Sequence, residues 1–198
     1  MTYASGRKAE YRADPLFVDR WSARAYTGEE ISDDILFALF EAARWAPSAS
    51  NSQPWRFLYA KRNAPDFDLY LSLLVERNRL WAKNAGALVV LVSKKTHIRP
   101  GSSEPTPARY HTFDTGAAWA NLALQASLLG WSTRAIGGFD SEAARRQLNV
   151  PDDYAVEVAI AIGRPGDKAL LHEDFQALES PNQRRPLAES VIGARFPA

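Results

Sequence analysis

Apolar side chains recur at helical spacing in three stretches of the chain. The first, residues 35–43, follows Ser32, a residue type that caps helix N-termini. Pro47 marks the end of this helix, because proline cannot continue one. The second stretch predicts one continuous helix over residues 66–81, and the third predicts a helix from about residue 114 to 129.

Strand patterns alternate with these helices. Residues 55–60 and the valine-rich run 87–93 predict strands, and residues 154–162 alternate like a strand that is covered on both faces. A shorter helix is expected to begin at Ser141. Residues 94–110 contain three prolines and a glycine, which predicts a long loop. Helices around a small sheet make an α+β sandwich the expected fold class.

Composition bounds the class of protein. The chain has 198 residues, of which 46% are apolar and 24% charged, as expected for one globular domain over 1–198. Its 24 basic and 23 acidic residues give a net charge of +1, which offers no general attraction to nucleic acid or to an anionic membrane. The apolar runs are far shorter than the ~18 residues of a membrane helix, and no signal peptide is evident. We therefore expect a cytoplasmic protein that binds neither nucleic acid nor a membrane.

The side chains available for chemistry are limited. The chain contains no cysteine, which excludes disulfides, thiolate nucleophiles and iron–sulfur ligation, and its 3 histidines lack the spacing of metal ligands. Glycine-rich phosphate loops of the G-x-G-x-x-G and G-x-x-x-x-G-K types do not occur in the sequence. Neither a metal site nor a separate dinucleotide-binding domain is expected.

The connection between the first predicted helix and the first strand concentrates polar groups. Residues 46–55, APSASNSQPW, hold Ser48, Asn51 and Gln53 between two prolines. We expect a stiff turn that presents hydroxyl, amide and backbone N–H groups to a polar, planar ligand. Gln53 could reach that ligand or brace the turn, and we favour bracing. The alternative is an ordinary helix-to-strand connection with turn chemistry.

A second polar motif, RWSAR at residues 20–24, places two arginines four positions apart. If this segment is extended, Arg20, Ser22 and Arg24 lie on one side of it. Guanidinium groups stay charged and donate hydrogen bonds in a planar fork, which suits a phosphate. The alternative is a solvated basic turn that precedes a helix.

Four segments, 20–24, 46–55, 130–140 (GWSTRAIGGFD) and 184–187 (RRPL), together resemble the motifs of the nitroreductase family in their order along the chain. The similarity extends from about residue 15 to residue 193. It implies FMN as cofactor and NAD(P)H as co-substrate. It also implies a nitroreductase-like sandwich, with a small mixed, mostly antiparallel sheet surrounded by helices, in an intertwined homodimer.

The resemblance gives the arginine motifs specific roles. Arg20, Ser22 and Arg24 would contact the phosphate, ribityl chain and pyrimidine of FMN, and Arg24 would place a cation near N1 and O2. Such a cation stabilises a flavin that has accepted hydride. Either Arg184 or Arg185 would return from the C-terminal segment to the phosphate, and the sequence leaves the choice open.

Other contacts follow from the same resemblance. The turn would contact the flavin held by the opposite subunit, Asn78 would bond the pyrimidine edge, and the N–H of Gly137 would bond N5. An exposed helical asparagine and a plain Gly-Gly hinge are the alternatives for the last two. The full set of predicted cofactor contacts is Arg20, Trp21, Ser22, Arg24, Pro47, Ser48, Ala49, Asn51, Asn78, Ile136, Gly137, Gly138, Arg184 and Arg185.

The implied activity is a ping-pong oxidation of NAD(P)H. The nicotinamide would deliver hydride to flavin N5 and leave, and a nitroaromatic, a quinone or a similar planar acceptor would take its place. No protein side chain is required as a general acid. Two alternatives stay open: a dedicated reductase, dehalogenase or dehydrogenase for one metabolite, and a flavin-binding module without turnover.

Three peripheral segments carry further expectations. Residues 1–14 are expected to be flexible, and residues 94–113 to form a lid loop that selects the acceptor. Residues 163–198 form an expected C-terminal arm, which has little periodicity of its own. We expect this arm to wrap a partner subunit, with a frayed terminus as the alternative.

Overall fold

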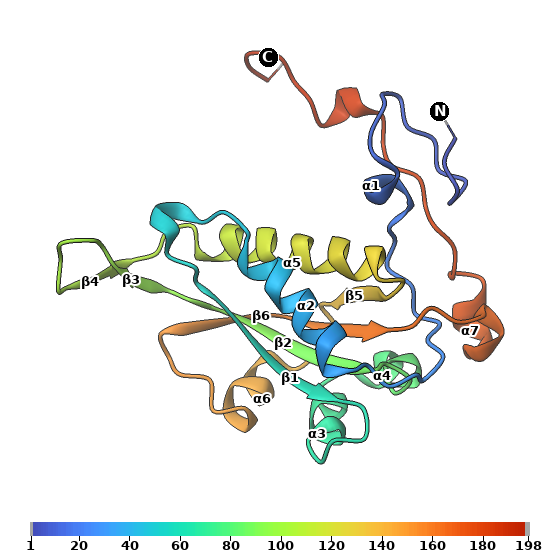
Figure 1. Cartoon of the computed structure of the whole chain (residues 1–198), viewed down its shortest axis with the longest axis horizontal. Helices are drawn as coiled ribbons and strands as arrows, with labels where there is room; N and C mark the ends of the chain where they lie inside the picture. Colours follow the sequence, from blue (N-terminus) through green and yellow to red (C-terminus); the bar gives the residue numbers. More distant parts are fainter. Residues whose placement is uncertain (1, 197–198) are drawn as a thin grey trace.

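The computed structural model describes residues 2–196, and its centre is a four-stranded sheet (Figure 1). The strands are β1 (Trp55–Lys61), β2 (Ala87–Lys94), β5 (Ser132–Ile136) and β6 (Tyr154–Gly163). Their spatial order is β1-β2-β6-β5, and every ladder between them is antiparallel. Within the described residues the small sheet is thus antiparallel throughout, without the parallel component that a mixed sheet would contain.

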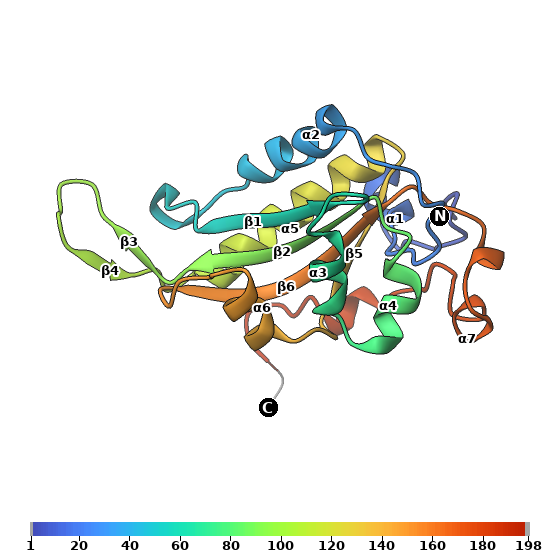
Figure 2. The same cartoon turned by 90° about the horizontal axis from the view of Figure 1, so that it is seen from below.

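Helices cover both faces of this sheet (Figure 2). On one face lie α2 (Asp33–Arg44) and α5 (His111–Leu128), and on the other lie α3 (Phe67–Ser72), α4 (Glu76–Ala82) and α6 (Ser141–Gln147). Because side chains alternate along a strand, β2 contributes Leu88 and Val90 to one core and Val89 and Leu91 to the other. The valine-rich run is apolar at every position for this reason, and the predicted α+β sandwich is confirmed.

Most helix boundaries follow local signals. The Ser32 hydroxyl caps α2 by accepting a hydrogen bond from the N–H three residues on, and α2 ends before Pro47 as predicted. Gly130 follows α5 with a φ of +73°, the left-handed conformation of a C′ residue. Two boundaries were misplaced: α5 begins at His111, and Asp140, one residue before the expected cap, caps α6.

The prediction of a single helix over residues 66–81 is wrong. The chain forms α3 and α4 instead, and the backbone between them bonds to the loop that follows β5. The Asp140 N–H donates to the Leu73 carbonyl (2.8 Å), and the Val75 N–H donates to the Gly138 carbonyl (3.1 Å). A helix cannot continue through this break because its backbone groups are bonded to a distant segment.

Residues 94–110 are not a loop throughout. β3 (Thr96–Ile98) and β4 (Pro105–Pro107) pair as an antiparallel hairpin that projects from one end of the molecule (Figure 1). Proline is tolerated in β4 because this strand pairs on one side only. The loop prediction is wrong for these two strands, and the last residues of the expected 94–113 lid belong to α5.

The two terminal segments lie side by side at the other end of the molecule (Figure 1). The first contains α1 (Pro15–Asp19), and the second contains η2 (Lys168–Leu170), α7 (Glu173–Gln176) and η3 (Leu187–Glu189). The described end of the tail, residues 182–196, is exposed at every position. Across residues 2–196, no helix has both the length and the apolar character needed to cross a bilayer.

Candidate functional site

An extended segment after α1 carries the predicted phosphate motif. Arg20 is partly buried, and its Nη1 donates to the Ser22 hydroxyl over 3.4 Å. Both side chains line a groove of ≈ 490 Å³ between this segment, α5 and the edge strand β5. The other lining residues are Phe17, Trp119, Ala120, Ala123, Leu124, Arg134 and Ala135. The groove thus combines two cations with apolar side chains of α5.

Arg24 does not line this groove. Its Nη1 lies 3.6 Å from Glu179 Oε2, and Glu179 Oε1 accepts hydrogen bonds from the N–H groups of Arg24 (2.6 Å) and Ala25 (2.8 Å). The second cation of the groove is Arg134 from β5, whose guanidinium donates to the Ser22 carbonyl. Burial, and next the charge of Arg24, lowers the pKa of Arg134. Sequence reasoning missed Arg134, although it lies inside the GWSTRAIGGFD motif.

Trp21 alternates to the other side of the same segment. Trp21 lines a smaller cavity of ≈ 200 Å³, which Trp131 and Ser132 also line. The Ser132 hydroxyl donates to the Trp21 carbonyl over 3.4 Å, which attaches the segment to β5. Arg20 lines both cavities, whereas Ser22 lines only the groove and Trp21 only the smaller cavity.

Three arginines, Arg7, Arg20 and Arg184, belong to segments that meet near the two termini. Arg7 and Arg184 line one cavity of ≈ 330 Å³, and Arg7 Nη1 donates to the Arg20 carbonyl (2.7 Å). Burial, and next the charge of Arg184, lowers the pKa of Arg20. Burial, followed by the charges of Arg184 and Arg20, lowers the pKa of Arg7. Across residues 2–196, no carboxylate lies within ion-pair distance of any of the three. Because like charges this close repel, the cluster favours a bound anion with more than one negative charge.

Arg185 lines the same cavity as Arg7 and Arg184 but differs from this arginine cluster (Arg7, Arg20 and Arg184) in having a carboxylate partner. Its side chain is 86% exposed, and its Nη1 lies 3.9 Å from Glu189 Oε2. Of the two neighbouring tail arginines, only Arg184 acts electrostatically on the other members of the cluster. The geometry therefore favours Arg184 for the role that the sequence left open.

The polar turn after α2 is held in an uncommon conformation. Ser50 and Asn51 both have a φ of +52°, and Gln53 has a φ of +46°, so left-handed non-glycine residues cluster here. The turn contains η1 (Ala49–Asn51) and is braced by its own side chains. Ser48 Oγ accepts from the Gln53 N–H (3.0 Å), and Gln53 Nε2 donates to Asn51 Oδ1 (3.1 Å). Gln53 thus braces the turn, as expected.

A buried carboxylate fastens this turn to α5. Asp114 is 4% exposed, and its Oδ2 accepts a hydrogen bond from the Ala49 N–H over 3.0 Å. Asp114 lies in the first turn of α5, where the helix dipole favours a negative charge. Pro47 and Asn51 remain exposed on the outside of the turn, where a ligand or a second chain can reach them.

Asn78 packs against the loop that follows β5. Its Nδ2 donates to the Gly138 carbonyl (3.0 Å), and a Cβ atom at Gly138 would lie 2.6 Å from the same nitrogen. A Cβ atom at Gly137 would meet nothing within 4 Å, so this glycine borders open space. Ile136, the last residue of β5, is buried. Asn78 therefore holds the loop in place through the amide nitrogen.

Two groups of predicted residues lie far apart within one chain, besides those at the loop after β5. The segment after α1 and the C-terminal tail lie toward the end of the molecule that carries the termini, whereas the turn lies beside the first turn of α5, toward the hairpin (Figure 1). α5 has 18 residues, which corresponds to about 27 Å at 1.5 Å per residue. The turn contributes nothing to the lining of the ≈ 490 Å³ groove, so one chain does not bring the two groups together.

Sequence comparison places these motifs in a known group of proteins. A family model described as the nitroreductase family matches residues 18–70 and 59–164. A Streptomyces coelicolor protein, provisionally named NADH dehydrogenase/NAD(P)H nitroreductase, is 31% identical over 169 residues, which span 76% of this chain and 81% of that protein. The chain belongs to the nitroreductase family. The resemblance inferred from the four motifs is thereby confirmed.

Solved structures agree with this assignment. One, described as an oxidoreductase containing FMN, superimposes with a TM-score of 0.95 at 43% identity and covers 100% of this chain and 99% of that chain. Another, provisionally described as a nitroreductase from Desulfovibrio desulfuricans in complex with FMN, gives a TM-score of 0.71 at 25% identity and covers 94% and 100%. The nitroreductase fold therefore extends over the tail that the family model does not match.

Proposed function

We propose that this member of the nitroreductase family is an FMN-dependent oxidoreductase that takes hydride from NAD(P)H and reduces a nitroaromatic, a quinone or a similar planar acceptor in a ping-pong cycle. The arginine cluster is the observation that carries this proposal. FMN ends in a phosphate dianion, and a cluster of cations without carboxylate partners is suited to such a group. The solved structure described as containing FMN adds support.

The residues of the groove fit the remaining parts of FMN. Arg20 and Arg184 would hold the phosphate, and the apolar side chains of α5 would face the flat ring. Gly137 and Asn78 do not line the groove; a Cβ atom at Gly137 would meet nothing within 4 Å, and Asn78 bonds the neighbouring Gly138 carbonyl, so the N–H of Gly137 would be the group that bonds N5. When bound, FMN supplies a ring that accepts hydride and returns electrons to a second substrate.

Arg134 takes over the role first expected of Arg24. A cation beside the pyrimidine of the flavin stabilises the negative charge that hydride transfer brings, but the charge of Arg24 is already paired with Glu179. Arg134 lines the groove and donates to a backbone carbonyl. In residues 2–196 no carboxylate lies within ion-pair distance of it, and the charge of Glu179 counters only part of the fall in its pKa. In this proposal, Arg134 holds the positive charge and Arg24 holds the segment in place.

The functional unit proposed here is a homodimer. α5 exposes Phe113 (78%) and Leu128 (64%), and the tail exposes Phe196 (81%), which is unusual for apolar side chains of this size. A two-fold axis that packs α5 against its own copy in antiparallel orientation would bring the turn of one chain to the arginine end of the other. Ser48, Ala49 and Asn51 would then contact the cofactor of the partner subunit, and the exposed tail would wrap that subunit.

The hairpin gives a dedicated metabolite reductase some support as a second candidate. A cleft of ≈ 960 Å³ lies between the turn and the hairpin, and its lining includes Asn51, Arg56, Lys94 and His97. Lys94 Nζ lies 3.6 Å from Asp153 Oδ2, whereas the Arg56 guanidinium donates only to backbone carbonyls. Asp153 also lines the cleft and pairs with Lys94, so Arg56 is the cation there that could meet an anionic acceptor, which is the role expected of the 94–113 lid. The cytoplasmic location stays a prediction.

Reconstitution tests the proposal in one series of measurements. The purified chain is incubated with FMN, separated from free cofactor by gel filtration with light scattering, and assayed for NADH and NADPH oxidation with menadione and nitrofurazone. We expect a yellow dimer with one FMN per chain that turns over both acceptors. A colourless protein contradicts the flavin assignment. A yellow protein that oxidises neither nucleotide supports the alternative of a flavin-binding module without turnover.

A further inference from the structure

The first residues of the chain form a folded loop beside the arginine cluster. The Tyr3 hydroxyl donates to the Ala13 carbonyl (2.7 Å) and accepts from the Ala13 N–H (3.1 Å), which closes this N-terminal loop, residues 2–14. The Ser5 N–H donates to Asp19 Oδ1 (2.9 Å), which attaches the loop to the end of α1. The segment that was expected to be flexible therefore has specific bonds to itself and to the body of the protein.

Arg7 is the centre of these contacts. It is 6% exposed, and among residues 2–196 it is the only lysine or arginine classed as buried. Its Nη1 donates to the carbonyls of Val18 (2.8 Å) and Arg20 (2.7 Å), at the C-terminal end of α1. Its Nε donates to the Asn182 carbonyl over 2.8 Å. One guanidinium thereby joins the N-terminal loop, the segment that carries Arg20 and the C-terminal tail.

The burial of this charge needs an explanation. A buried cation without a carboxylate costs free energy, and hydrogen bonds to neutral carbonyls offset only part of that cost. Burial is the largest cause that lowers the pKa of Arg7, followed by the charges of Arg184 and Arg20, and Asp19 counters them only in part. A bound anion at the arginine cluster would lower the cost for all three charges together.

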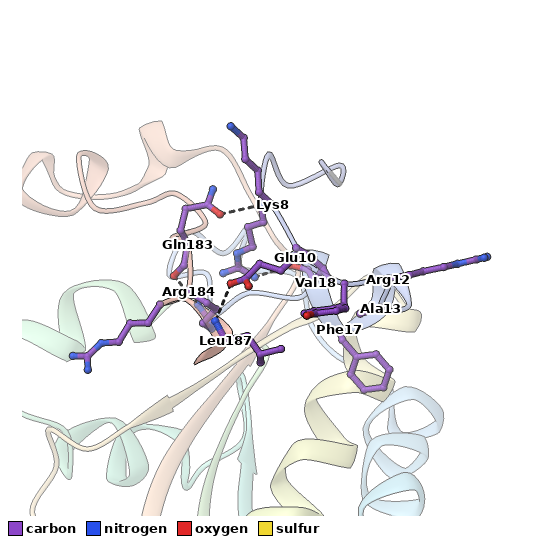
Figure 3. Close-up of a pocket in the computed structure, with 13 residues that line it drawn as sticks. Lys8, Glu10, Arg12, Ala13, Phe17, Val18, Gln183, Arg184 and Leu187 are labelled. Carbon is purple, nitrogen blue, oxygen red and sulfur yellow. Dashed lines mark hydrogen bonds between the residues drawn. The ribbon is translucent and has the colours of Figure 1, made fainter. Parts of the chain in front are cut away.

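Two further bonds hold the tail on either side of Arg184. The Lys8 N–H donates to Gln183 Oε1 (3.0 Å), and the Leu187 N–H donates to Glu10 Oε1 (2.8 Å), as Figure 3 shows. Both partners of the tail come from the N-terminal loop, directly after Arg7. The loop therefore fixes the backbone of the tail next to the backbone of the phosphate motif.

We propose that Arg7 is a positioning residue for the phosphate of the cofactor: by donating to the Val18, Arg20 and Asn182 carbonyls it holds the segment that carries Arg20 next to the tail that carries Arg184. This inference rests on the proposed FMN function. It adds a residue and a segment that none of the four motifs contains. Arg7 acts through the two other arginines, so its effect is confined to ligands that carry a phosphate.

The test compares two flavins that share a ring but differ in the phosphate. Dissociation constants of FMN and of riboflavin are measured by flavin fluorescence quenching for the full chain and for Arg7→Gln, Arg7→Lys and Arg12→Gln. Arg12 is the matched control: it belongs to the same loop and lines the same cavity, but it is exposed and its side chain points away from the other labelled side chains in Figure 3. Circular dichroism and thermal melting without flavin establish that each variant is folded.

Arg7→Gln is expected to weaken FMN about 10- to 100-fold and riboflavin by less than about 3-fold, as the loss of charge-assisted bonds implies. Arg7→Lys keeps the charge but lacks the planar fork, so it recovers only part of the loss. Arg12→Gln leaves both affinities unchanged. Equal FMN affinity in Arg7→Gln and the original chain overturns the inference, and full recovery in Arg7→Lys overturns the positioning role.

A measurement on the unmodified chain covers the case in which the variants do not fold. FMN is expected to slow amide hydrogen exchange in residues 2–14 and 180–186, whereas riboflavin, which lacks the phosphate, is not. Identical exchange with both flavins overturns the inference. If the unmodified chain binds neither flavin, the proposed function itself fails, so the two failures are distinguishable.

Discussion

The Nδ2 atom of Asn78 donates a hydrogen bond to the carbonyl oxygen of Gly138 over 3.0 Å. This contact joins α4 to the loop after β5, two segments that are far apart in the sequence. It also favours glycine at position 138, because the asparagine amide occupies the space that a side chain there would need. The neighbouring Gly137 has no such restriction, so adjacent glycines serve different purposes.

Gly138→Ala tests this difference. The added Cβ would lie 2.6 Å from Asn78 Nδ2 and 3.1 Å from Val75 Cγ2, so the Asn78 amide must move and its hydrogen bond to the Gly138 carbonyl is lost. We expect a loss of about 1–3 kcal/mol in the free energy of unfolding, measured by urea denaturation, and weaker FMN binding. Gly137→Ala is the control, since its Cβ meets nothing within 4 Å and its N–H is retained. Equal losses in the two variants would show that the contact with Asn78 does not restrict residue 138.

Asp114→Ala should release the polar turn. The Ala49 N–H would lose its carboxylate acceptor, at a cost of about 1–3 kcal/mol in unfolding free energy. Because the turn is proposed to contact the cofactor of the partner subunit, FMN affinity of the dimer should fall as well. Asp34→Ala is the control: Asp34 also lies in the first turn of a helix, but it is exposed, so its loss should cost at most about 1 kcal/mol.

Glu179→Gln tests the buried ion pair that holds Arg24. The glutamine keeps one oxygen for the N–H groups of Arg24 and Ala25 but removes the charge that the guanidinium faces at 3.6 Å. Breaking a buried pair typically costs several kcal/mol, and the retained acceptor reduces this to about 1–3 kcal/mol. Glu189→Gln, which breaks the exposed pair with Arg185, should change the free energy of unfolding, measured in urea, by less than about 0.5 kcal/mol. If Glu179→Gln lowers the free energy of unfolding by no more than this, the pair with Arg24 has no structural role.

Tyr70 makes stability depend on alkaline pH. Burial, and next the charge of Asp66, raises the pKa of its hydroxyl from 10.0 to about 12. The unfolded chain therefore loses this proton first, so the contribution of Tyr70 to stability is complete below about pH 10 and is lost as the pH rises toward 12. Tyr70→Phe should flatten the fall in melting temperature over that interval. Tyr11→Phe, at an exposed tyrosine, should reproduce the profile of the unmodified chain.

The sequence predicted elements whose signals are local. The cap at Ser32, the proline stop at residue 47, the C′ glycine at 130 and the apolar β2 were all correct because adjacent residues determine them. The break between α3 and α4 could not be predicted, since its hydrogen-bond partners lie in the loop after β5. β5 was missed for a related reason: it is short, and its pairing with β6 is visible only in three dimensions.

The candidate site shows the same division. Residue types alone singled out Arg20, Ser22 and the turn, which stay predicted cofactor contacts, but they did not indicate that Arg134 lines the same groove as Arg20. Arg24 has the right spacing and is drawn away by Glu179, a residue 155 positions later. Arg7 had no recognisable motif, and its position became evident only when its bonds to the Asn182 and Arg20 carbonyls were seen. Long-range pairing of charges is information that neither spacing nor periodicity contains.

The central claim is that the phosphate of FMN binds at the arginine cluster. The most direct measurement is a flavin titration of the unmodified chain, of the double variant Arg20→Gln/Arg184→Gln, and of Arg185→Gln as the control. The unmodified chain and Arg185→Gln should bind one FMN per chain, about 100-fold or more tighter than riboflavin, and the double variant should lose that preference. Unchanged FMN binding in a folded double variant, or no binding of FMN by the unmodified chain, would contradict the account.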